Sequence, residues 1–314
     1  MGAAEFPPEV AGLLGRLRER LAARADVVGV YVYGSLMTGD YSPAASDIDV
    51  VALVRREPDQ AMIRELTALH TALASTGGPT GQLHCLYVAA DAVSDPERLC
   101  TYWFGDRMTQ WQLKLLTQAE LAEAGVALHG PWPPPGLVPV PLADLQAAVY
   151  EEATGYWRQI SRRRRLWLQD TWIDHALVAL PRAEALLTTG DMITKGEAIG
   201  RLAAFGVPSA LAEEIRRRRD GRPVHVSPPG RLVRAVRARR AMQAGVARLS
   251  RLTPPESPRS LPWTVSFPIP CTLLPDPLHA LLNRYPSSPA HLVDPMCPAP
   301  AADVSESMCH RAAS

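Results

Sequence analysis

One stretch near the amino terminus constrains the possible folds more than any other part of the sequence. Residues 27–33 form a β-branched and aromatic run that is typical of a strand, and the run stops at Gly34-Ser35. A polar segment follows, and residues 47–54 resume an apolar run that opens with two aspartates. The stretch therefore predicts two strands that frame one polar turn.

The two aspartates at the start of the second strand indicate a metal site. Because strand side chains alternate between faces, Asp47 and Asp49 are expected to point the same way, about 7 Å apart along the chain. Two like charges this close need a cation between them, and two hard oxygen ligands that leave room for phosphate oxygens suit Mg²⁺. Gly34 lets the backbone approach a phosphate, and Ser35 offers N–H and hydroxyl donors to it.

The order of strand, Gly-Ser, polar loop, Asp-x-Asp and strand resembles the nucleotidyltransferase superfamily, whose fold is shared with DNA polymerase β. The resemblance implies an α/β (α+β) fold with a small mixed sheet, in which Asp47 and Asp49 hold Mg²⁺ and take part in catalysis. It also implies that Gly34 and Ser35 cradle the phosphates of a nucleoside triphosphate. The alternative interpretation is a plain hairpin whose acids are solvated.

The third predicted strand lacks an acid that this resemblance calls for. Residues 82–88 predict a short strand, and in the superfamily the strand at this place carries a third carboxylate that holds metal or takes a proton. Here His84 stands at that place, and Asp91 and Asp95 lie beyond the strand. A neutral imidazole can accept a proton near neutral pH, so His84 is the candidate general base. The alternative is that the position is lost and the enzyme is weak or inactive.

The composition indicates a globular chain of two unlike parts. With 314 residues, 47% of them hydrophobic, the chain can form two modest domains. Residues 1–150 hold 10 Lys and Arg against 17 Asp and Glu, whereas residues 151–252 hold 20 against 10. The acidic first part and the basic second part favour a two-part molecule.

Targeting and disulfide signals are weak. No apolar run approaches the roughly 20 residues of a membrane helix, and Glu5 and Glu9 stand where a signal peptide needs positive charge. The five cysteines are odd in number and lack Cys-x-x-Cys spacing, so neither a disulfide framework nor a zinc site is expected. We expect a cytoplasmic monomer without a membrane partner.

Helical periodicity and proline-rich breaks divide the chain into three parts. The first part is a nucleotidyltransferase domain over residues 1–135, with helices predicted at 8–24, 58–73 and 110–128. The second is a helical substrate-binding domain over 136–252, with helices predicted at 142–168, 170–187, 193–205, 209–219 and 232–249. The third, residues 253–314, has 13 prolines in 62 residues and few charges, so we expect a disordered tail.

The second part has a closer resemblance, to the aminoglycoside 3″/9-adenylyltransferases, the enzymes that inactivate streptomycin and spectinomycin. The matching pieces are residues 126–131, Ala179-Leu180-Pro181-Arg182 and Thr194-Lys195-Gly196-Glu197-Ala198. The resemblance implies that Arg182 and Lys195 reach substrate or nucleotide phosphate. It further implies transfer of AMP from Mg-ATP to a hydroxyl of a small acceptor, an activity that confers antibiotic resistance.

Two other functions fit parts of the sequence. A degenerate family member would bind nucleotide or a protein partner without turnover. A nucleic-acid-modifying nucleotidyltransferase would use the basic runs of the second part, although such runs are usually solvated helix faces. The positive charge of that part also predicts that streptomycin-class polycations are poor substrates, unless Glu151, Glu152, Asp170 and Asp174 line the cleft.

Overall fold

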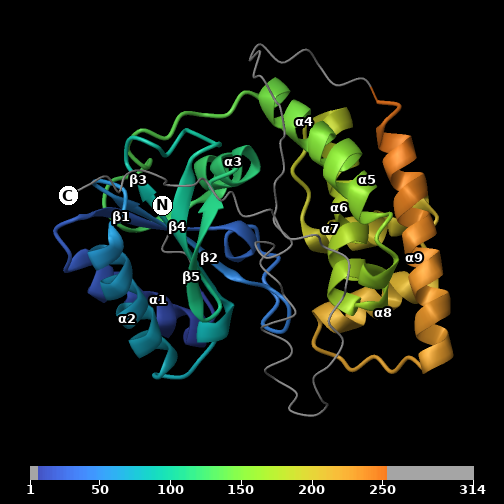
Figure 1. Ribbon diagram of the computed structural model, residues 1–314, viewed down its shortest axis with the longest axis horizontal. Coiled ribbons are helices and arrows are strands. Elements are labelled where there is room, and N and C mark those ends of the chain that lie inside the picture. The colour runs from blue at the N-terminus through green and yellow to red at the C-terminus, as the bar shows by residue number, and fades with distance from the viewer. Residues whose placement is uncertain (1–5, 253–314) are drawn as a thin grey trace, which may run out of the picture. The chain divides into compact units, whose positions relative to one another are not determined.

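A six-stranded mixed sheet forms the first half of the computed structural model, which describes residues 6–252 (Figure 1). Its strands are β1 (Val27–Tyr33), β2 (Ile48–Val54), β3 (Leu83–Ala89), β4 (Leu99–Phe104), β5 (Arg107–Gln112) and β6 (Val126–His129). They lie in the order β5-β4-β3-β2-β1-β6. Strands β2 and β3 run parallel and the other neighbours antiparallel, so the sheet is mixed, as predicted.

Helices cover both faces of the sheet. Helices α1 (Pro8–Ala22) and α2 (Gln60–Ala74) lie on one face, and α3 (Leu115–Ala124) lies on the other (Figure 1). Side chains along β2 alternate between these two faces. Val50 packs in the cluster that holds the α1 leucines, whereas Val51 packs in the cluster of the α3 face. Asp49 has the parity of Val51 and therefore belongs to the α3 face.

The helix predicted over residues 110–128 is wrong at both ends. The structure has the edge strand β5 before α3 and the short strand β6 after it, and β4 was not predicted. Strand β5 pairs with β4 from Leu99 opposite Gln112 to Phe104 opposite Arg107, and none of its residues is buried. Such a polar edge strand lacks the apolar alternation that identifies a strand in sequence.

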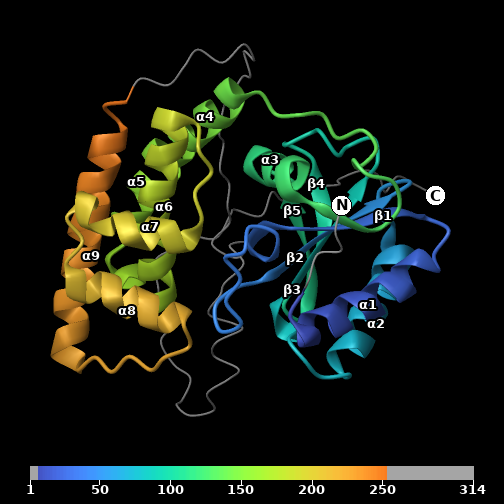
Figure 2. The ribbon, with the colours of Figure 1, turned by 180° about the vertical axis from the view of Figure 1, so that it is seen from behind.

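The second half is all helix, as predicted. Its helices are α4 (Leu142–Glu151), α5 (Trp157–Ile160), α6 (Asp170–Thr189), α7 (Lys195–Arg201), α8 (Ser209–Arg219) and α9 (Pro228–Leu249). Helix α6 contacts α4, α7 and α9, and these helices are seen together in Figure 2. The single helix predicted over 142–168 is broken by a π-helical turn at 152–156, where Gly155 has low helix propensity, and by a 3₁₀ turn at 164–168.

The cores of the two halves are largely separate. The large helical cluster includes Trp157, Trp167 and Met242 and shares no residue with the two clusters of the sheet. A small cluster of Leu115, Leu145 and Leu186 joins α3 to α4 and α6. The domain boundary at 135/136 stays a prediction, and the predicted tail over 253–314 lies outside the described residues. Among residues 6–252 no helix is long and apolar enough to cross a membrane.

Candidate active site

The pairing of four strands places one row of side chains across the sheet. In this register Tyr33 of β1 lies opposite Asp49 of β2, Asp49 lies opposite His84 of β3, and His84 lies opposite Phe104 of β4. Because paired residues of neighbouring strands point to the same face, these four side chains share the face that α3 partly covers. Two residues predicted to form the site, Asp49 and His84, are therefore brought together by strand pairing.

His84 lies between the two aspartates. Its Nε2 atom is 3.7 Å from Asp47 Oδ1, and its Nδ1 atom is 3.7 Å from Asp49 Oδ1. The His84 side chain is 13% exposed and packs on the Phe104 ring at 4.7 Å between centroids, whereas the Asp47 side chain is 48% exposed. The two carboxylates thus converge on one side, as the strand period predicted.

Nearby charges and burial shift the pKa values of Asp47 and His84. Burial raises the pKa of Asp47, and the nearby charges of His84 and Lys195 oppose the rise. Burial lowers the pKa of His84, but the polar contact with Asp49 and the negative charges of Asp47 and Asp49 outweigh burial, so the pKa is raised. The imidazole is thus held in an anionic environment that also attracts a metal cation.

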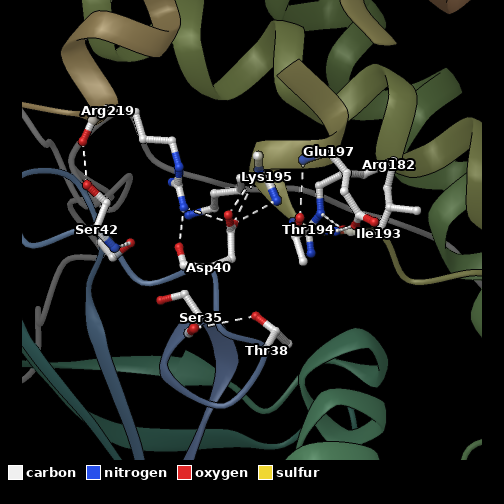
Figure 3. Close-up of polar contacts among 12 residues, drawn as sticks. Ser35, Thr38, Asp40, Ser42, Arg182, Ile193, Thr194, Lys195, Glu197 and Arg219 are labelled. Atoms are coloured by element: carbon white, nitrogen blue, oxygen red, sulfur yellow. Dashed lines mark hydrogen bonds and ion pairs between the residues drawn. The ribbon is translucent and has the colours of Figure 1, made fainter. Parts of the chain in front are cut away.

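Gly34 begins the loop that we call the glycine loop, residues 34–46. Residues Gly34–Leu36 form a 3₁₀ turn directly after β1, with Gly34 at φ +74°. A Cβ atom on Gly34 would lie 2.9 Å from Asp49 Oδ2. Glycine is therefore required both for the left-handed backbone and for the close approach to Asp49. The Thr38 hydroxyl donates to the Ser35 carbonyl at 3.4 Å, which closes the turn (Figure 3).

The rest of the glycine loop is held by side chains. The Ser46 hydroxyl accepts from the Ser42 N–H at 2.9 Å, and Ser46 is buried. Gln82, just before β3, donates to the Pro43 carbonyl at 2.6 Å and accepts from the Tyr41 hydroxyl at 3.2 Å. These bonds fix the path of the loop between β1 and β2.

Arg182 and Lys195 come from the helical half. The Arg182 guanidinium donates to the Ile193 carbonyl at 3.0 Å (Figure 3). It also pairs with Glu120 of α3 at 3.2 Å. Lys195 is the first residue of α7, and its charge lowers the pKa of both Asp47 and His84. Lys195 thus contributes positive charge to the group, whereas the Arg182 side chain is already engaged by an acid.

Three charged residues near this group were not among the predicted site residues. Burial raises the pKa of Glu120, the Arg182 charge opposes that rise, and the negative charge of Asp49 adds to it. Asp40 of the glycine loop pairs with Arg219 of α8 at 2.8 Å. Sequence offered only faint signals for them, since Glu120 lies in a plain helical pattern and Arg219 ends a run of four arginines.

Asp91 and Asp95 do not belong to this group. His84 is the second residue of β3, and both aspartates follow the end of the strand at Ala89. At about 3.3 Å per residue, the strand alone separates its two ends by roughly 20 Å. The acid missing from β3 is therefore not replaced by these aspartates.

The carboxylates of Asp47 and Asp49 suit an Mg²⁺ ion that also binds a ligand. They do not form a metal site made of protein side chains alone. Among residues 6–252 there is no group of three or more His, Cys, Asp or Glu side chains arranged to hold a metal. Asp47 and Asp49 supply two hard oxygen donors on one side, both at least partly exposed. Mg²⁺ commonly binds one or two carboxylates together with substrate phosphates, so these two residues fit it.

Comparison with protein families matches residues 14–116 to the nucleotidyltransferase domain. This match runs from within α1 through β1, the glycine loop, β2, α2 and β3–β5, and so includes both aspartates and His84. The chain therefore carries a nucleotidyltransferase domain over residues 14–116 and is an enzyme of the transferase class. No curated protein matches the chain.

Among solved structures, the chain is similar to spectinomycin adenyltransferase AAD(9) from Enterococcus faecialis, crystallised with ATP and spectinomycin. The alignment covers 74% of this chain and 98% of that one, with a TM-score of 0.54 and 13% sequence identity. At this identity the likeness is one of fold, and it extends from the sheet into the helical half. The predicted fold class is confirmed.

Proposed function

We propose that this enzyme transfers AMP from Mg-ATP to a hydroxyl group of a small acceptor and releases pyrophosphate. The observation that carries the proposal is the convergence of Asp47 and Asp49 beside the Gly34 turn, on the exposed end of β2. The nucleotidyltransferase domain and the similar fold of an adenyltransferase crystallised with ATP support it. In this proposal residues 1–135 form the nucleotidyltransferase domain and residues 136–252 the acceptor-binding domain.

Each residue of the site has a role in the proposed reaction. Asp47 and Asp49 would hold Mg²⁺, which when bound supplies positive charge to the phosphate oxygens. Gly34 and Ser35 present backbone N–H groups and a hydroxyl to the triphosphate, and Lys195 offsets its charge. The acceptor oxygen attacks the α-phosphorus while the bond to pyrophosphate breaks. The phosphate groups need positioning and charge stabilisation more than covalent chemistry.

His84 would take the proton of the acceptor hydroxyl. The ring lies close to both aspartates, near the start of β3, where the Phe104 and Tyr102 rings pack against it. His84 is thus placed 3.7 Å from one oxygen of each carboxylate. The competing proposal is a degenerate enzyme, in which His84 only neutralises the two acids and no turnover occurs.

Arg182 has a narrower role than the resemblance implied. Its guanidinium already pairs with Glu120 and with the Ile193 carbonyl. We therefore propose that Arg182 contributes positive charge to the site while staying bound to α3, and that Lys195 is the cation that meets the phosphates directly. Among residues 6–252, no ion pair or hydrogen bond is found for the Lys195 ammonium group, which leaves it free for a ligand.

The acceptor is proposed to be neutral or anionic. Two of the acids considered as a possible cleft lining for a polycation are paired internally, because Asp174 binds Arg218 at 2.6 and 2.8 Å and Asp170 binds Arg234. Glu151 and Glu152 remain exposed at the end of α4. With its acids neutralised in this way, the basic helical half repels aminoglycosides of high positive charge.

A nucleic-acid substrate is not favoured. Several arginines of the basic runs are used inside the helical half: Arg218 and Arg234 bind acids, and Arg239 donates to the Ser161 carbonyl at 2.7 Å. Arg218 and Arg234 thus link α6, α8 and α9, and Arg239 links α9 to the turn after α5. They therefore do not form a free stripe for a phosphate backbone.

Pyrophosphate release tests the proposal. The chain is incubated with Mg²⁺ and each of the four nucleoside triphosphates, labelled at the α-phosphate, against separate pools of aminoglycosides, neutral sugars, nucleosides and tRNA. We expect ATP-dependent release with a neutral or anionic hydroxyl compound and transfer of the label to it. Triphosphate binding without release in any pool would favour the degenerate enzyme, and release with tRNA alone would favour nucleic-acid modification.

A further inference from the structure

Asp40 connects the glycine loop to the first turn of α7. Its carboxylate accepts the Lys195 N–H at 3.0 Å and the Gly196 N–H at 3.2 and 3.3 Å, and it pairs with the Arg219 guanidinium at 2.8 Å (Figure 3). We propose that Asp40 is a positioning residue, which docks α7 on the glycine loop so that the Lys195 ammonium faces the carboxylates of the site.

The amides at the start of α7 show how specific this contact is. The first N–H groups of a helix have no partner within the helix. In α7 the Thr194 hydroxyl accepts the third N–H, from Glu197, at 3.2 Å, and the Glu197 side chain accepts the Thr194 N–H at 2.8 Å. The first two N–H groups are left, and Asp40 accepts both from a position 155 residues earlier in the chain.

Gly196 leaves space for this contact. A Cβ atom at residue 196 would lie 2.7 Å from Asp40 Oδ1, which is closer than two such atoms can approach. Gly200, in the same helix, has no atom within 4 Å of the corresponding position. The two glycines of α7 therefore form a matched pair, of which only Gly196 is needed for the Asp40 contact.

Arg219 adds a second connection to the same loop. It donates to the backbone carbonyl of Asp40 as well as to the carboxylate, and the Ser42 hydroxyl donates to the Arg219 carbonyl (Figure 3). The side chains of Arg219 and Asp40 are 13% and 17% exposed. An ion pair shielded to this extent is screened less than a surface pair, and the loss of one partner leaves a poorly solvated charge.

The docking matters because the backbone of Lys195 is fixed by Asp40, whereas its ammonium group has no ion pair or hydrogen bond within residues 6–252. Asp40 belongs to the loop that runs from the Gly34 turn to Asp47, so the contact holds the backbone of Lys195 against the segment that carries these site residues. If Asp40 is removed, the start of α7 moves and the ammonium no longer stays over the site. The role of Lys195 in binding a nucleotide phosphate rests on the proposed function. The docking of α7 by Asp40 does not depend on that function.

Amide exchange measures the docking without activity. In the full chain, hydrogen exchange of the Lys195 and Gly196 amides is followed by NMR in the wild type, Asp40→Asn and Gly196→Ala. We expect both amides to exchange about 10-fold faster or more in the two variants, because a charge-assisted hydrogen bond is lost or displaced. The Glu197 amide, capped by Thr194, and the Gly200→Ala protein are the controls and are expected to change little. Unchanged exchange at 195 and 196 in both variants would overturn the docking.

Nucleotide affinity measures the positioning. The affinity for Mg-ATP is compared in wild type, Asp40→Ala, Lys195→Ala and the double variant, with Glu213→Gln on the exposed face of α8 as control. We expect Asp40→Ala to weaken binding about 10-fold in the wild-type background but less than about 2-fold when Lys195 is absent, because Asp40 acts through Lys195. Gly196→Ala is expected to follow Asp40→Ala, and Gly200→Ala the wild type.

The outcomes separate the two proposals. Losses from Asp40→Ala and Lys195→Ala that multiply in the double variant would overturn the positioning role while leaving the proposed function intact. Tighter Mg-ATP binding in Asp40→Ala would also overturn it, because the contact would then be a lock that competes with nucleotide. Absence of any triphosphate binding by the wild-type chain would contradict both the positioning role and the proposed function, even if the amide exchange confirms the docking.

Discussion

Arg182 of α6 and Glu120 of α3 form an ion pair at 3.2 Å, between elements that lie 62 residues apart in sequence. Their side chains are 29% and 23% exposed, so the pair is partly shielded from water. We predict that Glu120→Gln lowers the free energy of unfolding by about 1 kcal/mol, since it leaves the Arg182 charge without its partner.

Chemical denaturation of matched variants checks this prediction. The control is Glu213→Gln, which breaks the more exposed Arg216–Glu213 pair at 2.6 Å and is expected to change stability by less than about 0.5 kcal/mol. The double variant Glu120→Gln/Arg182→Gln is expected to lose less than the sum of its single changes. Equal effects of the two single glutamate changes would show that the Glu120 pair is no more than a surface contact.

Gly34→Ala tests the close approach of the glycine loop to Asp49. Both Gly34 (φ +74°) and Gly39 (φ +71°) have left-handed backbones, so alanine at either costs about 1–2 kcal/mol of stability. Only at Gly34 does the added Cβ meet Asp49, at 2.9 Å, whereas nothing lies within 4 Å at Gly39. We therefore predict a similar stability loss in both variants, but loss of Mg-ATP binding in Gly34→Ala alone. Equal affinities in the two variants would mean that Asp49 is not held by this contact.

His84 is predicted to act in the chemical step. With saturating nucleotide and acceptor, His84→Ala should lower the rate about 10²–10⁴-fold, which is the usual contribution of a general base, and leave Mg-ATP affinity almost unchanged. His84→Glu, which restores the acid that the superfamily resemblance calls for, is the companion variant. A normal rate in His84→Ala, with a higher rate in His84→Glu, would show that the histidine is a relic.

The secondary structure around the aspartates could be predicted from the sequence because it depends on short-range sequence patterns. A strand period of two places Asp47 and Asp49 on one side, and the leucine spacing of residues 8–24 and 58–73 predicts helices that the structure confirms within a few residues. Such signals depend only on neighbours in the chain.

The contacts between distant residues could not be predicted in this way. Asp40 and Arg219 are 179 residues apart, and nothing in either segment indicates the other. In the sequence, Asp40 and Arg219 each resemble an ordinary solvated charged residue. Their pairing depends on how the helical half packs, which neither segment indicates. The edge strand β5 was missed for a similar reason, because its pairing with β4 rather than its own pattern defines it.

His70 is predicted to make stability depend on pH. It is buried on α2, its Nε2 lies 2.7 Å from the Tyr87 hydroxyl, and its ring stacks on Trp103 at 4.6 Å. Burial lowers the pKa of His70 to about 3, from 6.5. Between these values the unfolded chain binds a proton that the folded chain does not, so stability falls as pH falls, by up to about 1.4 kcal/mol per pH unit.

Urea unfolding at a series of pH values from 7 down to about 4 measures this slope. His70→Gln removes the titrating group and should flatten the slope in that window, whereas His225→Gln, at an exposed position, should leave it unchanged. The same slope in the wild type and in His70→Gln would show that other groups cause the acid sensitivity.

Calorimetric titration of ATP with Mg²⁺ and with EDTA tests the central claim most directly, that Asp47 and Asp49 together hold the metal of a nucleotide complex. The wild type is expected to bind ATP at least about 10-fold more tightly with Mg²⁺, a difference of about 1.4 kcal/mol. Asp47→Asn and Asp49→Asn should each abolish that difference, and Glu19→Gln, an exposed change on α1, should retain it. Metal-dependent affinity that survives in both aspartate variants would contradict the account.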